Sequence, residues 1–183
     1  MRLLSALIAE AGSLAVLWYV LSSQRRNWKD IGWKLRWTDM PLAVGLYLAT
    51  SLASILIYLP IQISYQEYSG HYLTPKTLHG MLGGGISVLS ITFVLLNPFF
   101  EELIVRGYFM SEVLELGGGG ALAVLASVLV QMSYHLYQGF ANCIALTVTF
   151  TIFAIYFLRT RRIAPLVMVH FIIDAYALIR YSI

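Results

Sequence analysis

The feature that most constrains this chain is a series of long apolar segments separated by short polar ones. A transmembrane helix needs about 20 predominantly apolar residues to cross about 30 Å of hydrocarbon. Six segments meet this requirement, so the sequence predicts an all-α, polytopic bundle of about six transmembrane helices surrounded by a lipid bilayer. The predicted spans are residues 3–22, 41–64, 84–114, 119–137, 141–158 and 164–181.

Composition agrees with a membrane protein. The 183 residues are 59% hydrophobic and only 11% charged, whereas soluble domains are about 25% charged. The net charge of +3 is small, and the basic residues cluster beside apolar segments. This pattern is typical of charges that orient a protein in a membrane, rather than of a nucleic-acid-binding surface. We therefore expect no nucleic-acid partner and an integral, multi-pass location in the cell (plasma) membrane of a prokaryote.

Basic residues concentrate in two connecting segments. One lies between the first two predicted spans, and the other, Arg159 to Arg162, follows the fifth. With six spans, both segments fall on the same side of the membrane. The positive-inside rule makes that side cytoplasmic, so both ends of the chain are expected to face outward.

The third predicted span contains charged residues that are costly in a membrane. Glu102 and Arg106 are four residues apart, so on a helix they share a face and are expected to form an ion pair. Glu101 lies about 100° further round, because a helix has 3.6 residues per turn. It is therefore a carboxylate without a partner in its own helix.

Two other predicted spans carry histidines. The midpoint of positions 101 and 135 is 118, inside the glycine run at residues 117–120. If those glycines form the turn between two antiparallel helices, Glu101 and His135 lie at the same depth. His170 and Asp174 share a face of the last span, and we expect Asp174 to lie closer to that depth than His170.

These residue types fit proton-transfer chemistry, and other interpretations remain open. A buried carboxylate can act as a general base on water that attacks a carbonyl, while a histidine orients the water or donates to the oxyanion. The same side chains could bind zinc, although the HExxH arrangement of zincins is absent. Singly, each is explained at least as well by helix packing, and Glu10 most simply by an interfacial position or a minor polar contact. Together, on three neighbouring spans, they favour a polar site.

Three motifs resemble those of a known family. "EELIVRG" at residues 101–107 resembles the EExxxR signature of the CAAX protease and bacteriocin-processing (CPBP, or Abi) family of intramembrane proteases. "HLYQG" at 135–139 is similar to the second motif of that family, and "RRIAPLVMVHFIID" at 161–174 to its third, HxxxN/D. The resemblance covers roughly residues 97–176 and divides the chain into N-terminal helices with a loop, 1–83, and a catalytic helical core, 84–183.

The resemblance implies a glutamate-dependent intramembrane endopeptidase that acts on a membrane-associated peptide or protein. Its catalytic residues would be Glu101, which activates water, with His135 and His170 assisting and Asp174 as the fourth member. Glu102 and Arg106 take supporting roles. No cofactor is expected, with zinc and a metalloprotease mechanism left open as alternatives.

Two positions depart from the family pattern. Gln131 stands where the second motif usually has an aromatic residue, four positions before its histidine. Asp174 stands where characterised eukaryotic members have Asn, and an ionised Asp is a poor donor to an oxyanion. Asp174 is therefore expected either to be protonated or to serve His170.

Two other functions remain as alternatives. One is a non-catalytic membrane immunity or chaperone-like protein that binds a peptide in the same cavity. The other is a transporter or proton relay, which is disfavoured because the sequence shows no inverted repeat. The substrate also stays open among prenylated CAAX proteins, bacteriocin leaders and proteins with C-terminal sorting tails.

Overall fold

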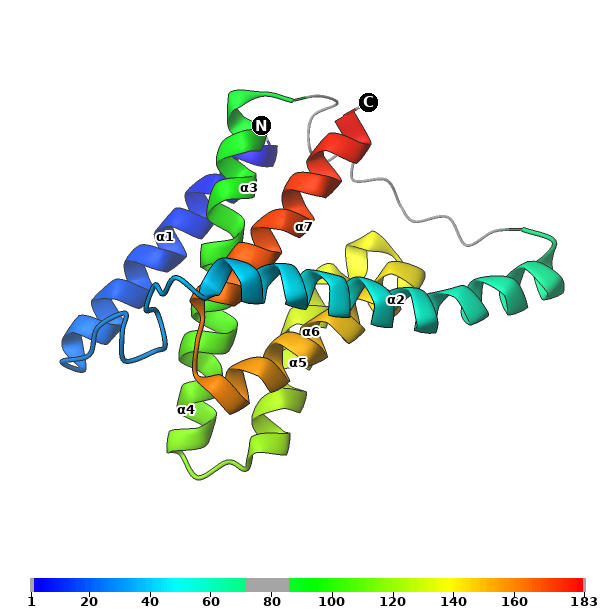
Figure 1. Ribbon diagram of the computed structural model, residues 1–183. Helices are drawn as coiled ribbons and strands as arrows, with labels where there is room; N and C mark the ends of the chain where they lie inside the picture. The colour runs from blue at the N-terminus through cyan, green and yellow to red at the C-terminus, as the bar shows by residue number, and fades with distance from the viewer. Residues whose placement is uncertain (1, 72–85, 183) are drawn as a thin grey trace.

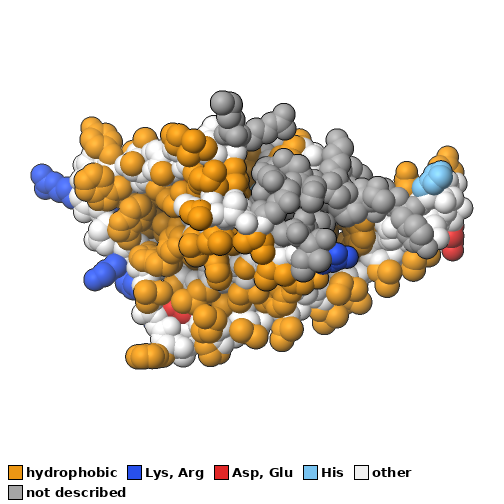
Figure 2. Space-filling view, turned by 90° about the horizontal axis from the view of Figure 1, so that it is seen from above, with side chains coloured by type: hydrophobic (Ala, Val, Ile, Leu, Met, Phe, Trp, Pro, Cys, Tyr) orange, Lys and Arg blue, Asp and Glu red, His pale blue; other side chains and the backbone are white. Residues whose placement is uncertain are grey.

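A computed structural model describes residues 2–71 and 86–182, and within them the chain is helical with short connections. Five helices of this described part are long and apolar enough to cross a membrane. Hydrophobic side chains cover most of the described part of the face seen in Figure 2. The predicted class, an all-α integral membrane bundle, is confirmed. The boundary expected between residues 83 and 84 lies outside the described residues.

Each of the six predicted spans corresponds to a helical segment. The segments are α1 (Arg2–Ser23), α2 (Asp39–Ser69), a continuous third segment (Val88–Glu115), α5 (Gly120–His135) with a short 3₁₀ turn (Leu136–Gln138), α6 (Phe140–Thr160) and α7 (Ala164–Ser182). The first five segments are the candidate membrane spans of the described residues, and α7 is not among them.

The third segment lies at the centre of the arrangement. Its upper part, α3 (Val88–Glu101), packs against α1 on one side and α7 on the other (Figure 1). The bundle is completed by α2, which packs against both α6 and α7, and by α5 against α6. Because α3 contacts two helices that are far apart in the sequence, side chains at its C-terminal end can meet partners from several elements.

The third segment is not a uniform α-helix. After α3 it continues as a π-helix, Glu102–Phe109, before α4, Met110–Glu115. The π-helix holds most of the "EELIVRG" stretch, and Pro98 lies in the turn before it. Wider π turns inside α-helices are frequent at functional sites. The sequence interpretation assumed α geometry here and did not predict this change.

The glycine run forms the expected turn between α4 and α5. The α4 helix ends in a Schellman motif, in which the N–H of Gly118 bonds to Val113 and that of Gly117 to Leu114. Gly117 has a φ of 86°, a conformation that glycine adopts without a steric penalty. The helices on either side of this turn are consecutive and pack together.

The two basic segments lie against each other. The backbone N–H of Ile163 donates to the carbonyl of Gly32, which joins the loop after α1 to the loop before α7. Arg162 also forms an ion pair with the buried Asp39 at the start of α2. Both basic segments are therefore on one side of the bundle, as the charge pattern predicted.

Candidate active site

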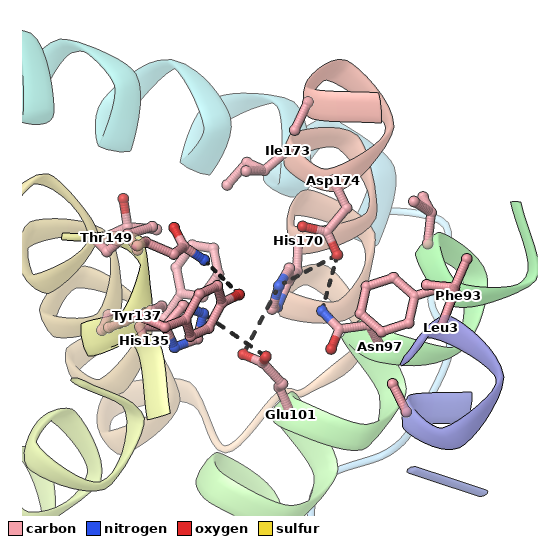
Figure 3. Close-up of a pocket in the computed structure, with 17 residues that line it drawn as sticks. Leu3, Phe93, Asn97, Glu101, His135, Tyr137, Thr149, His170, Ile173 and Asp174 are labelled. Atoms are coloured by element: carbon pink, nitrogen blue, oxygen red, sulfur yellow. Dashed lines mark hydrogen bonds and ion pairs between the residues drawn. The ribbon is translucent and has the colours of Figure 1, made fainter. Parts of the chain in front are cut away.

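Three helical segments bring the sequence-predicted residues together (Figure 3). Glu101 is the last residue of α3 and Glu102 the first of the π-helix. His135 ends α5, and His170 and Asp174 lie on α7. The antiparallel turn between α4 and α5 places His135 beside Glu101, as the position of the glycines predicted.

Glu102 is the centre of a buried charged cluster. Its Oε1 accepts hydrogen bonds from Nη1 of Arg106 at 3.3 Å and from Nδ1 of His170 at 2.8 Å. Glu102 and Arg106 are fully buried, and the Arg106 guanidinium lies 5.4 Å from the Phe150 ring centroid and 5.9 Å from that of Phe153. The predicted Glu102–Arg106 ion pair is confirmed, and it also fixes His170.

Glu101 has partners from two other helices. Its Oε2 accepts a 2.6 Å hydrogen bond from the side-chain amide of Gln131. Its Oε1 lies 3.9 Å from Nε2 of His135, and its Oε2 lies 4.0 Å from Nε2 of His170. These two carboxylate–imidazole separations are too long for direct hydrogen bonds and short enough for a water molecule to bridge.

The tautomer of His135 follows from its other neighbour. Nδ1 lies 2.8 Å from the backbone carbonyl of Gln131. A carbonyl oxygen only accepts, so Nδ1 carries the hydrogen and Nε2 is the nitrogen turned toward Glu101. The ring is also held by Tyr134 and Phe150, whose centroids lie 4.7 and 5.0 Å away. His135 is therefore held by its backbone contact and by two aromatic rings, with Nε2 facing the cavity.

His170 faces carboxylates with both ring nitrogens. Nδ1 donates to Glu102, while Nε2 lies 3.6 Å from Oδ2 of Asp174 on the next turn of α7. The expected shared face of His170 and Asp174 is confirmed. We expected Asp174 to lie closer to the depth of Glu101, and His170 is the residue whose Nδ1 bonds to Glu102 and whose Nε2 lies 4.0 Å from Glu101.

The cluster opens onto a partly open cavity of about 440 Å³. Most of its wall is apolar and comes from α1, α3, α6 and α7. Figure 3 shows Glu101, His135, His170 and Asp174 converging on this space, with Asn97 and Phe93 from α3 on one side and Thr149 from α6 on the other. A polar cluster against an apolar wall is the usual character of a small-molecule or peptide site.

Three residues of the site were missed or set aside by sequence reasoning. Gln131, noted only as a departure from a motif, bonds to Glu101. Asn97 bonds to Asp174 at 3.0 Å. Glu10, interpreted as interfacial or a minor contact, is buried in α1, the helix that packs against α3. The signal that could have revealed all three is a polar side chain in an apolar span.

Within residues 2–71 and 86–182, no group of three or more His, Cys, Asp or Glu side chains converges in a way that would hold a metal ion. From the sequence, zinc binding by the glutamate, histidine and aspartate side chains of the site remained open. The expectation that the site works without a metal ion stays a prediction.

Comparison with known proteins agrees with the motifs. A family model described as type II CAAX prenyl endopeptidase Rce1-like matches residues 83–176, which is more than half of the chain and contains the candidate catalytic residues. Searches of curated proteins and of solved structures found no match. The chain therefore belongs to the type II CAAX prenyl endopeptidase Rce1-like family, in agreement with the CPBP resemblance predicted from its motifs.

Proposed function

We propose that this protein is an intramembrane endopeptidase that hydrolyses a peptide bond of a membrane-associated peptide or protein. The observation that carries the proposal is the position of Glu101, whose carboxylate lies 3.9 and 4.0 Å from two imidazoles at the wall of an apolar cavity. Membership of a CAAX endopeptidase family supports the same reaction class.

In the proposed reaction, a water molecule bound between Glu101 and His135 attacks the carbonyl carbon of the peptide. Glu101 takes one proton from the water as the new carbon–oxygen bond forms, giving a tetrahedral oxyanion. The carbon–nitrogen bond then breaks and the proton passes to the leaving amine. The products are a carboxylic acid and an amine, which ionise to a carboxylate and an ammonium, so one water and one peptide bond are consumed.

The two histidines are proposed to have different parts in this reaction. His135 accepts at Nε2 and so fixes the second hydrogen of the water, because its Nδ1–H is engaged with the backbone. His170 is held by Glu102, and its Nε2 faces the space beside Glu101. In this proposal His170 carries a hydrogen on both ring nitrogens, so Nε2 would donate toward the oxyanion or the leaving amine. Glu102 and Arg106 support the site by fixing His170.

The test uses purified protein in proteoliposomes and a farnesylated peptide ending in a CAAX motif, which is chosen because of the matched family. Wild-type protein should release the C-terminal tripeptide. Glu101→Ala and His170→Ala should abolish release while the protein remains folded and inserted. The matched controls are Glu115→Ala and His71→Ala, which remove the same groups from exposed positions and should leave the rate unchanged.

Metal use is a separate question in the same assay. We propose a site without metal, so EDTA or 1,10-phenanthroline should leave the rate unchanged. Activity that disappears with a chelator and returns with zinc would replace this part of the proposal with zinc-assisted hydrolysis.

A second candidate is a non-catalytic immunity or chaperone-like protein that binds a peptide end in the 440 Å³ cavity. It predicts saturable binding of the peptide with no fragment released, and a cellular phenotype that survives Glu101→Ala. We also propose that residues 84–183 form the catalytic core and that the protein resides in a prokaryotic plasma membrane. Fractionation of the source cells tests that location.

A further inference from the structure

Asn97 occupies a distinctive place in the cavity wall. It lies one turn before Glu101 on α3 and is only 9% exposed, so the two side chains project from the same face of that helix. Both line the cavity, and Figure 3 shows the Asn97 amide next to Asp174. Its Nδ2 donates a 3.0 Å hydrogen bond to Oδ2 of Asp174.

This hydrogen bond fixes the orientation of the amide. An Asn side chain turned the other way would place its carbonyl oxygen against a carboxylate oxygen, and two acceptors repel each other. Nδ2 of Asn97 therefore faces Asp174. A primary amide nitrogen carries two hydrogens, so one N–H remains after the bond to Asp174 is made.

The same bond limits what Asp174 can do. Its Oδ2 accepts from Asn97 and lies 3.6 Å from Nε2 of His170. This oxygen therefore acts as the acceptor of the Asn97 N–H and is not itself a donor. A tetrahedral oxyanion that forms beside Glu101 needs hydrogen-bond donors fixed in advance, and Asn97 offers one from a buried, oriented amide.

We propose that Asn97 is a catalytic residue that donates its second N–H to the oxyanion, and that Asp174 is the positioning residue that orients the amide. The inference rests on the proposed function, because it names the donor for the intermediate that the Glu101-activated water creates. The negative charge on that intermediate arises when the water oxygen bonds to the carbonyl carbon. It disappears when the carbon–nitrogen bond breaks.

The test measures kcat and KM separately on the farnesylated CAAX peptide. Asn97→Leu keeps the approximate volume and removes both N–H groups. Removing one oxyanion donor lowers kcat by about 10²–10³-fold, and KM should stay within about threefold because the oxyanion is absent from the bound substrate. The control on the same helix is Thr92→Val, an exposed position outside the cavity that should behave as wild type.

Variants at both positions cover misfolding of Asn97→Leu and test the role of Asp174. Asn97→Asp keeps the shape but removes the N–H groups and places two carboxylates in contact, so kcat should fall. Asp174→Asn and Asp174→Leu both remove the charge at position 174, but only Asn keeps an oxygen that can accept from Nδ2 of Asn97. The kcat of Asp174→Asn should therefore exceed that of Asp174→Leu by at least about tenfold, and equal kcat for these two variants would contradict the orienting role.

The outcomes separate this inference from the proposed function. Wild-type protein that releases no tripeptide removes the proposed function and the inference with it. Wild-type cleavage together with an Asn97→Leu kcat within about threefold of it removes the inference alone. A raised KM with unchanged kcat also overturns it, because that result places Asn97 in substrate binding.

Discussion

Gln131 on α5 donates a 2.6 Å hydrogen bond to Oε2 of Glu101 on the neighbouring helix, and both side chains are buried. The bond occupies one oxygen of the carboxylate. Oε1, which lies 3.9 Å from Nε2 of His135, is left as the oxygen that takes a proton from water. Gln131 is therefore a positioning residue for the general base.

Gln131→Leu should lower kcat by roughly tenfold or more. A hydrogen bond to a charged group contributes about 1.5–3 kcal/mol, and the carboxylate of Glu101 would be free to rotate without it. Cleavage of the farnesylated peptide in proteoliposomes gives kcat, with KM expected to change little. Gln66→Leu on α2 is the control, and it lies outside the cavity. A Gln131→Leu kcat within twofold of wild type would contradict the positioning role.

Arg106→Met should destabilise the protein strongly. The Arg106–Glu102 pair is fully buried, so removal of the cation leaves the buried Glu102 carboxylate with His170 in place of its arginine partner, and breaking a buried pair costs about 3–5 kcal/mol. Thermal unfolding in detergent measures the change. Arg159→Met removes the same charge from an exposed position and should have little effect.

A double variant separates stability from chemistry at the same cluster. Glu102→Leu with Arg106→Met removes both charges, so its melting temperature should exceed that of Arg106→Met alone. It should still be inactive, because His170 loses the 2.8 Å contact with Glu102 that fixes its ring. A fully active double variant would show that His170 needs no such support.

Gly107→Ala should also lower stability, by about 1–3 kcal/mol, because tight packing resists added volume. A Cβ at Gly107 would meet the carbonyl oxygen of Ile31 at 3.1 Å and its Cδ1 at 3.3 Å, where the loop after α1 packs on the π-helix. Gly45 has no atom within 4 Å of the equivalent point, so Gly45→Ala should be neutral or stabilising. Equal melting temperatures for the two variants would contradict this packing argument.

Much of the fold was predictable because it follows from simple periodicities. The length of each apolar segment predicted a helix, and the glycines at 117–120 predicted the turn that brings Glu101 and His135 together. The ion pair of Glu102 with Arg106 followed from their spacing of four residues. These features depend on local sequence, or on one short turn, so no knowledge of distant packing was needed.

The remaining features depend on contacts between helices far apart in the sequence. Nothing in residues 102–109 marks the π-helix, which forms where the third segment packs against α5 and α6. Asn97 and Gln131 were recognisable as polar residues in apolar spans, but their partners come from α7 and α3. The register of α7, which decides that His170 rather than Asp174 contacts the glutamates, is likewise set by packing.

The charge on Glu101 is the central requirement of the proposed mechanism. Glu101→Gln keeps the shape of the side chain and removes the base, so it tests that requirement with the least change in structure. Glu115→Gln makes the same substitution at an exposed position. Both variants should fold and bind the peptide as wild type does.

The most direct measurement is therefore the kcat of purified Glu101→Gln relative to Glu115→Gln, at equal amounts of folded protein. A general base contributes about 10²–10⁴-fold, so the account predicts a kcat for Glu101→Gln that is lower by at least about 10²-fold. A Glu101→Gln kcat equal to that of Glu115→Gln would contradict it.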